Sequence, residues 1–216
     1  MLEKVHQKKP VINALVSFLR LTVVLSCRSK AYNFEKRING KLDKNAVPLS
    51  VCCWNVRTLL DKTGSTRPER RTALVCKELK RLSVDIAALS ETRLSGEDHL
   101  TEASSGYTIF WVGKRKGERR EGGVGFAIRT NLLPMVELPT GISDRIMMLR
   151  VSLSGGRYLT ILSVYAPTLQ AQEETASVFY ETLRTTLRSI PFDDKVLLIG
   201  DFNARVGKDF NTWDVI

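Results

Sequence analysis

A carboxylate and an amide side chain follow a short apolar run near the end of the 216-residue sequence. The run, Val196 to Ile199, is too short for a confident helix and rich in branched residues, which predicts a strand buried on both faces. Asp201 and Asn203 follow it two residues apart, so in an extended chain they point to the same side. Asp201 offers a base or a metal ligand, and Asn203 offers a neutral donor and acceptor. The alternative is a turn in which both side chains bind their own backbone.

Three more polar residues stand where apolar stretches end, namely Asn55, Glu91 and Tyr165. Each has an ordinary structural explanation. Asn55 can cap a turn, and Tyr165 can be a half-buried core residue. Glu91 can form an ion pair with Arg93. Ligand-binding groups of layered α/β proteins project from strand ends, so we expect these residues to meet the Asp–Asn pair at one rim.

The elements that must position these residues begin with a strand, a helix and a second strand. Residues 49–59 are typical of a strand that runs into a loop, and residues 84–94 of a buried strand. Between them, Pro68 suits a first helical turn. This order predicts a parallel pair of strands joined by a crossover. The helix stripe expected to face the core consists of Leu74, Val75, Leu79 and Leu82.

From Tyr107 onwards, strands follow one another in quick succession. Their sequences are YTIFWVG, GVGFAIR, RIMMLRVSL and RYLTILSVYAP. Ser154-Gly155-Gly156 separates the last two and is typical of a hairpin turn. A second helix is expected after Pro167, and Pro191 ends it; its apolar face consists of Phe179, Leu183, Leu187 and Ile190. Strands that alternate with helices predict an α/β fold.

The net charge of +10 is concentrated at the start of the chain. Residues 1–50 contain ten Lys or Arg and three acidic residues, so a charge of +7 lies there and +3 lies in the other 166 residues. We expect residues 1–47 to form a basic leader, poorly ordered or an isolated helix, that associates with nucleic acid. Residues 48–216 are long enough for one domain with a sizeable core. The sequence identifies no protein partner.

A second basic stretch, KRKGERRE, occupies residues 114–121. Such a run forms a solvated surface loop in most proteins, and a loop that contacts phosphates is the sharper interpretation. The candidate nucleic-acid contacts are Lys114, Arg115, Lys116, Arg119 and Arg120.

The cysteine pattern and the first apolar segment bear on the compartment. The four cysteines show no CxxC spacing, so we expect reduced, buried thiols, which suits a cytosolic or nuclear protein. The apolar stretch at residues 11–27 is too short for a comfortable membrane span and is interrupted by Arg20. We therefore expect no stable membrane insertion, and a nuclear or cytoplasmic location rather than a secretory or mitochondrial one.

Five motifs occur in the order seen in the endonuclease/exonuclease/phosphatase superfamily, which the chain therefore resembles. They are Trp54-Asn55 after a strand, LSETRL with Glu91, GGVGFAI from Gly122, SVYAPT with Tyr165, and IGDFNARVG with Asp201 and Asn203. These motifs are most similar to those of the apurinic-endonuclease-type domain of non-LTR retrotransposons and of the craniofacial development protein 2 group derived from such elements. The resemblance covers about residues 49–214 and implies a four-layer α/β sandwich of the DNase I-like type.

The resemblance implies a divalent-metal-dependent hydrolase that cleaves phosphodiester bonds of DNA. It assigns Glu91, with Asn55 beside it, to a cation, Mg²⁺ or alternatively Mn²⁺. The cation would offset charge on the scissile phosphate and on the departing 3′ oxygen. Tyr165 would place its phenol against the phosphate, and Asp201 would hold or deprotonate the attacking water. Asn203 would donate to a phosphate oxygen as negative charge develops.

The sequence departs from the family pattern because it lacks the Ser-Asp-His element expected near the end of the domain. Its only histidines are His6 and His99, and the polar stretch around His99 predicts a surface loop. We therefore expect a partial, C-terminally truncated sandwich whose second sheet keeps little beyond the strand at residues 196–199. Inner-face residues would then form an exposed apolar patch, and activity would be impaired.

Two other functions stay open at this point. The chain can be a catalytically inactive domesticated or residual domain that binds nucleic acid or a protein partner. It can also be a phosphodiesterase that acts on a phosphoinositide or sphingolipid head group. The motifs VYAPT and DFNARVG are closer to the retrotransposon branch, which favours DNA over a lipid.

Overall fold

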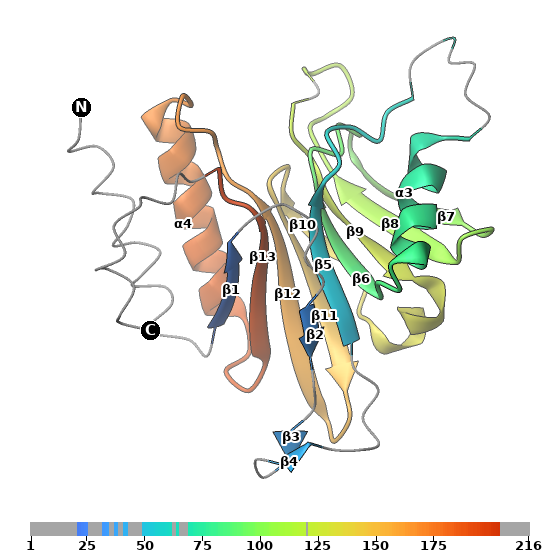
Figure 1. The fold of residues 1–216 in the computed structure, drawn as a ribbon. Coiled ribbons are helices and arrows are strands. Elements are labelled where there is room, and N and C mark those ends of the chain that lie inside the picture. Colours follow the sequence, from blue (N-terminus) through green and yellow to red (C-terminus); the bar gives the residue numbers. More distant parts are fainter. Residues whose placement is uncertain are drawn as a thin grey trace, which may run out of the picture.

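Two β-sheets pack against each other, and one helix covers the outer face of each (Figure 1). The computed structural model describes residues 49–61, 64, 69–119 and 121–203, and the backbone of four short strands before residue 49. In the described part, the first sheet has the strand order β2-β5-β6-β9-β8-β7, and the second has the order β1-β13-β12-β11-β10.

In chain order the elements are β1 (Leu21–Leu25), β2 (Tyr32–Phe34), β3 (Arg37–Ile38), β4 (Lys41–Leu42), β5 (Leu49–Asn55), α3 (Arg71–Arg81), β6 (Ile86–Ser90), β7 (Glu97–Glu102), β8 (Tyr107–Val112), β9 (Val124–Arg129), the 3₁₀ helix η1 (Thr130–Met135), β10 (Thr140–Ser143), β11 (Ile146–Leu153), β12 (Arg157–Tyr165), α4 (Glu173–Ser189) and β13 (Lys195–Asp201).

Each sheet contains one parallel pair joined by a helical crossover. β5 and β6 are parallel and flank α3 in the chain, as predicted, and β12 and β13 are parallel and flank α4. In register, Asn55 lies opposite Ser90, and Tyr165 lies opposite Asp201. The carboxyl ends of parallel neighbours lie at the same edge of a sheet. The two crossovers therefore place candidate residues side by side in each sheet.

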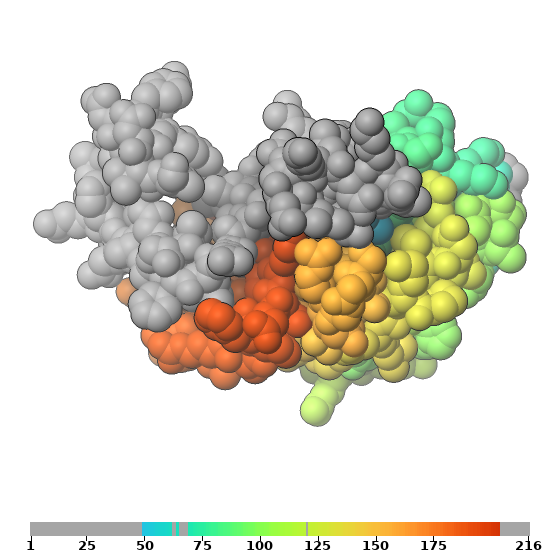
Figure 2. Space-filling view, turned by 90° about the horizontal axis from the view of Figure 1, so that it is seen from below, coloured from blue at the N-terminus to red at the C-terminus, as the bar shows by residue number. Residues whose placement is uncertain are grey.

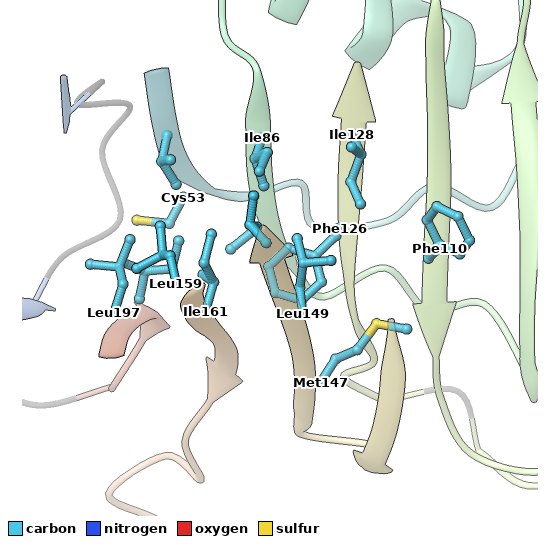
Figure 3. Close-up of a cluster of buried hydrophobic side chains, with 14 of the residues drawn as sticks. Cys53, Ile86, Phe110, Phe126, Ile128, Met147, Leu149, Leu159, Ile161 and Leu197 are labelled. Carbon is cyan, nitrogen blue, oxygen red and sulfur yellow. The ribbon is translucent and has the colours of Figure 1, made fainter. Parts of the chain in front are cut away.

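The space between the sheets is filled by alternate residues of their strands. Figure 3 shows Phe126 and Ile128 of the first sheet and Leu149, Ile161 and Leu197 of the second in this layer. All five are at most 1% exposed. Because successive side chains of a strand point to opposite faces, every second residue contributes to this core.

The remaining faces of both sheets pack against the helices. α3 contributes Cys76 and Leu79 to one cluster, and α4 contributes Phe179, Leu183 and Leu187 to the other. The central strands are consequently buried on both faces, which explains their continuous apolar runs. Four layers result, in the order helix, sheet, sheet, helix.

The buried face of α3 differs from the stripe predicted from its leucines. Leu74 and Leu82 are 41% and 44% exposed, whereas Thr72, Cys76 and Leu79 are buried. The Thr72 hydroxyl donates to Glu102 of β7 at 2.5 Å. This hydrogen bond allows a polar residue to occupy the inward face, which hydrophobicity alone did not indicate.

The second sheet is larger than the sequence predicted. β11 pairs with β12, and β10 pairs with β11, so the strand at residues 196–199 has partners that cover the inter-sheet core. Seen from below, the red, orange and yellow segments of this half of the chain adjoin one another (Figure 2). The prediction of an exposed apolar patch was wrong, because β12 pairs with β13, and β11 and β10 continue the same sheet.

Parts of the predicted leader are strands rather than a disordered or helical arm. β1 is parallel to β13, and β2 is antiparallel to β5, so each extends one of the two sheets. The other residues before Leu49, apart from β3 and β4, lie outside the described residues. The domain boundary at residue 48 stays a prediction.

His99 lies on the edge strand β7 and not in the predicted surface loop. Its ring stacks on Phe110 of β8 with ring centroids 5.6 Å apart, and His99 Nδ1 lies 3.7 Å from Asp98 Oδ1. Polar residues are common on exposed edge strands, which is why this strand resembled a loop in the sequence. β8 and β9 separate β7 from β6, so His99 is remote from the strand ends that carry the candidate residues.

Three of the four cysteines, Cys52, Cys53 and Cys76, are buried, as predicted, and Cys27 lies outside the described residues. Burial raises the pKa of the Cys76 thiol to about 12, and the nearby Glu102 carboxylate acts in the same direction. Among the described residues, no helix is long and apolar enough to cross a membrane.

Replacing Leu149 by Ala tests the inter-sheet core. Leu149 is fully buried, so we expect Leu149→Ala to lower the free energy of unfolding by about 2–5 kcal/mol. Val178 of α4 is 67% exposed, and Val178→Ala should change it by less than about 0.5 kcal/mol. Urea unfolding measures both values; equal, small effects of the two substitutions would contradict the described packing.

Candidate active site

Four polar side chains from the two sheets meet at one end of the inter-sheet core. Asn55 donates through Nδ2 to Glu91 Oε1 at 2.7 Å and to Asp201 Oδ2 at 3.1 Å. The Tyr165 hydroxyl donates to the same Glu91 oxygen at 3.3 Å. Asn55 ends β5 and Glu91 follows β6 in the first sheet, whereas Tyr165 and Asp201 end β12 and β13 in the second. These residues lie together, as expected, and the site spans the seam between the two sheets, which the sequence did not indicate.

The strand period that builds the core also places these polar groups. Cys53 and Ile199 belong to the core between the sheets, and Asn55 and Asp201 each follow one of them by two residues. Tyr165 packs against the same core with its ring. Alternate residues share a face of a strand, so the polar site continues the inner face of both sheets.

Glu91 is held in a turn with unusual backbone angles. Glu91 and Arg93 have φ of 56°, a left-handed conformation that is uncommon in residues other than glycine. Thr92 N–H and Arg93 N–H donate to the carbonyls of Gly123 and Gly122, at 3.1 and 2.9 Å. A Cβ atom at Gly123 would lie 2.4 Å from Thr92 Oγ1, so a side chain there would push the turn away. Such backbone conformations cluster at functional sites, where the surrounding structure enforces them.

Asp201 and Asn203 form a local turn as well as a part of the site. Asn203 N–H donates to Asp201 Oδ1 at 3.0 Å, and its side-chain Nδ2 donates to the Ala166 carbonyl at 2.6 Å. Asn203 has φ of 45°, so the pair does not continue the extended strand. Each Asp201 oxygen accepts one hydrogen bond from the protein, which fixes the plane of the carboxylate.

The Tyr165 phenol stays protonated at neutral pH. Burial raises its pKa above the ordinary value, and the Glu91 carboxylate raises it further, while the Arg145 guanidinium and the Asn203 amide oppose these effects. The phenol is therefore a hydrogen-bond donor in this site.

Three arginines that were not singled out as site residues each contact one residue of the site. Arg93 approaches Glu91 Oε2 to 3.4 Å, and the two side chains are 48% and 20% exposed. Arg57 N–H donates to Asn55 Oδ1 at 3.0 Å, and the Arg145 guanidinium lies 5.2 Å from the centre of the Tyr165 ring. Arg57 and Arg93 follow site residues by two positions, which was an available signal, whereas nothing in the sequence links Arg145 to Tyr165.

The basic β8–β9 loop, predicted to contact nucleic acid, leads into the site. Arg115, Lys116 and Arg119 are exposed, Lys114 is partly buried, and Arg120 lies outside the described residues. Arg119 pairs with Glu121 at 2.7 Å. The loop ends at Gly122, where a Cβ atom would be 3.4 Å from the Tyr165 ring. Its contact with nucleic acid stays a prediction.

The donor set suits Mg²⁺ better than a metal held by the protein alone. No group of three or more His, Cys, Asp or Glu side chains in the described ranges could hold a metal ion. Mg²⁺ needs only one or two carboxylates, because waters and substrate phosphates complete its coordination. Glu91 offers such a carboxylate, partly exposed. Asn55 directs Nδ2 to Glu91 and Oδ1 to Arg57, so ligation by its oxygen requires rotation of the amide.

Residues 52–215 match the model of the Endonuclease/Exonuclease/phosphatase family. The chain belongs to this family. The match confirms the resemblance that the five motifs indicated, and the two packed sheets confirm the predicted α/β sandwich of the DNase I-like type. The description of the family refers to nucleases and phosphatases, so hydrolysis of phosphate esters is its general chemistry.

Two curated relatives are craniofacial development protein 2 of Bos taurus and of Tragulus javanicus. The chain is 31% and 30% identical to them over 155 residues, which is 71% of this chain and 24% and 25% of theirs. The aligned part thus spans about a quarter of the length of these relatives.

Similar solved structures include D. rerio TDP2 complexed with single strand DNA product, with 18% identity and a TM-score of 0.47. That match covers 76% of this chain and 64% of TDP2. Another is ANGEL2, a 2′,3′-cyclic phosphatase, with 16% identity, a TM-score of 0.44 and coverage of 77% of this chain and 56% of ANGEL2.

Replacing Asn55 by Asp tests whether one amide joins the two carboxylates. Asn55→Asp would place three carboxylates together, so repulsion should raise their pKa values in the folded state. A carboxyl group with a raised folded pKa stabilises the fold at low pH and loses this contribution as the pH rises. We expect metal-free Asn55→Asp to be destabilised by about 1–3 kcal/mol at about pH 8, and by less near pH 5.

The measurement is urea unfolding of the variant and the wild type at both pH values. Asn131→Asp is the matched control, because Asn131 is exposed in η1, away from β5 and β13. A pH dependence of Asn55→Asp equal to that of Asn131→Asp would contradict the joined carboxylates.

Proposed function

We propose that this chain hydrolyses phosphodiester bonds of DNA with the help of a divalent cation, as a retrotransposon-type endonuclease domain. The observation that carries the proposal is the Asn55 amide that joins Glu91 and Asp201 across the two sheets, with the Tyr165 phenol on the same Glu91 oxygen. Membership of the family supports hydrolysis of a phosphate ester. The choice of DNA rests on the retrotransposon-like motifs and on the basic groups around the site.

Glu91 is the proposed ligand of Mg²⁺, with Asn55 beside it. Bound there, the cation supplies Lewis-acid charge to the phosphate. Glu91 is suited to this because its turn is fixed by hydrogen bonds to the Gly122 and Gly123 carbonyls, which keeps the carboxylate in place without the ion.

Asp201 is the proposed base that orients the attacking water and accepts its proton. Its two oxygens are fixed by Asn55 and by the Asn203 backbone, so a water bound to either oxygen has a defined direction. Positioned acid–base groups contribute about 10²- to 10⁴-fold to the rate. Asn203 is the proposed donor to a phosphate oxygen through its side-chain amide, which also lies beside the Tyr165 hydroxyl.

Tyr165 and Arg93 are the proposed partners of the phosphate. A protonated phenol can donate to a phosphate oxygen as negative charge develops. Arg93 supplies positive charge beside Glu91. Phosphate contacts from such groups position a nucleic acid without reading its sequence.

No imidazole from the described residues reaches this site, because His99 lies on the far edge of the first sheet. In the proposed mechanism, the departing oxygen takes its proton from Tyr165 or from solvent. We expect slow turnover, by about 10²- to 10⁴-fold compared with a site that has a positioned acid.

The test is nicking of supercoiled plasmid and of abasic-site DNA by the purified 216-residue chain. We expect slow, Mg²⁺-dependent nicking that disappears in the double variant Glu91→Gln/Asp201→Asn and on chelation of the metal. Nicking that persists in the double variant would come from a contaminating nuclease and would contradict the proposal.

Binding of a fluorescent oligonucleotide, measured on the same proteins, distinguishes the proposed enzyme from an inactive domain that binds nucleic acid. If the chain and its double variant bind the oligonucleotide equally and neither nicks DNA, the proposal fails and an inactive binding domain replaces it.

A further inference from the structure

Arg145 contacts Tyr165 in three ways. Its backbone carbonyl accepts the Tyr165 N–H at 2.9 Å, and its side-chain Nη1 donates to the Tyr165 carbonyl at 3.2 Å. Its guanidinium carbon also lies 5.2 Å from the centre of the Tyr165 ring, within the range of a cation–π contact. One residue thus binds both backbone polar groups of Tyr165 and covers its ring.

Arg145 is well placed to do this because it lies in the tight turn between β10 and β11. In the antiparallel pair, Ile146 lies opposite Val164, so the residue before β11 reaches the end of β12. Asp144 and Arg145 separate β10 from β11, and the Arg145 side chain is half-buried there. Its position is therefore set by the sheet and not by a long loop.

The Tyr165 ring needs such support because its hydroxyl makes a long hydrogen bond. The 3.3 Å contact with Glu91 is at the weak end of the range for O–H···O bonds, so it cannot by itself fix the ring. Gly122 approaches the ring at Cδ1 and Cε1, which limits movement toward the β8–β9 loop. The ring also packs against the core, and the arginine adds a restraint on both its backbone and its exposed side.

We propose that Arg145 is a positioning residue that holds the Tyr165 phenol toward Glu91 and thereby acts on the proposed reaction through Tyr165. A shift of about 0.5 Å in a catalytic group is enough to impair a site, so the residue that fixes the ring matters even without contact to substrate. The catalytic consequence rests on the proposed function. The placement of the phenol does not, and it can be measured in a protein without activity.

Lysine cannot replace arginine fully in this role. A lysine ammonium can lie near the ring, but it lacks the planar fork that lets one side chain donate to a carbonyl while stacking on an aromatic face. Arg145→Lys should therefore retain part of the effect, and Arg145→Met should lose it.

The first experiment is NMR of protein labelled with ¹³C in the tyrosine rings, with the Tyr165 signals assigned by Tyr165→Phe. We expect Arg145→Met to shift and broaden the Tyr165 ring signals, and Arg145→Lys to give intermediate positions. Arg81→Met is the control, because Arg81 pairs with Glu78 on the exposed side of α3. Tyr165 signals that move no more in Arg145→Met than in Arg81→Met would overturn the proposal. If Arg145→Met does not fold, the comparison of Arg145→Lys with Arg81→Met decides in the same way.

The second experiment is a double-mutant cycle in the nicking assay. If Arg145 acts through the phenol, Arg145→Met should lower the rate about tenfold with Tyr165 present and less than about twofold in Tyr165→Phe. Equal losses in both backgrounds would overturn action through Tyr165. Should the wild type lack nuclease activity, the proposed function fails alone, and the NMR result still supports or overturns the placement of the phenol.

Discussion

The packing of the two sheets is the constraint on which the site depends. Asn55 and Asp201 are 146 residues apart in the chain and belong to different sheets, yet their side chains are 3.1 Å apart. The apolar layer between the sheets, with members such as Cys53 and Ile199 just before them, sets this separation. Protein interiors are packed to near-crystalline density, so adding or removing one methylene group between the sheets affects the polar residues at the end of the core. The geometry of the hydrogen bonds in the site therefore depends on how the core packs, whereas these hydrogen bonds contribute little to the packing of the sheets.

The strand ends and their polar residues could be predicted because they depend on local pattern. The apolar run before Asp201 is buried on both faces, and the strand period carries Asn55 and Asp201 to the inner face. The partners of the strands could not be predicted, because pairing is set by tertiary contacts. This is why the extent of the second sheet was underestimated, why β7 resembled a loop, and why Arg145 had no link to Tyr165. The left-handed angles at Glu91 also have no signal in its sequence, since they are enforced by Gly122 and Gly123.

The ordinary interpretation of each site residue and its functional interpretation turned out to be compatible. Asp201 accepts a hydrogen bond from the backbone of its own turn, Glu91 pairs with Arg93, and Tyr165 packs against the core. The ordinary interpretations predicted these contacts. The same groups also converge on one site. Polar groups at the end of a core must be satisfied in the absence of substrate, because an unpaired buried donor or acceptor costs about 1–3 kcal/mol. Local turns and ion pairs therefore do not argue against catalysis.

Charge balance limits what such a site can bind. Two carboxylates, Glu91 and Asp201, share one amide donor, and the arginines approach the site from other sides: Arg93 contacts a Glu91 oxygen and Arg145 covers the Tyr165 ring. A bare anion near the carboxylates would be repelled, and a bare cation near the arginines would be repelled as well. Under the proposed function, a phosphate together with a divalent cation would satisfy both parts, because the carboxylates would attract the cation while Arg93 and the phenol would attract the phosphate oxygens. This pattern of charges is the physical reason to propose a metal-assisted phosphodiesterase rather than a simple basic surface for nucleic acid.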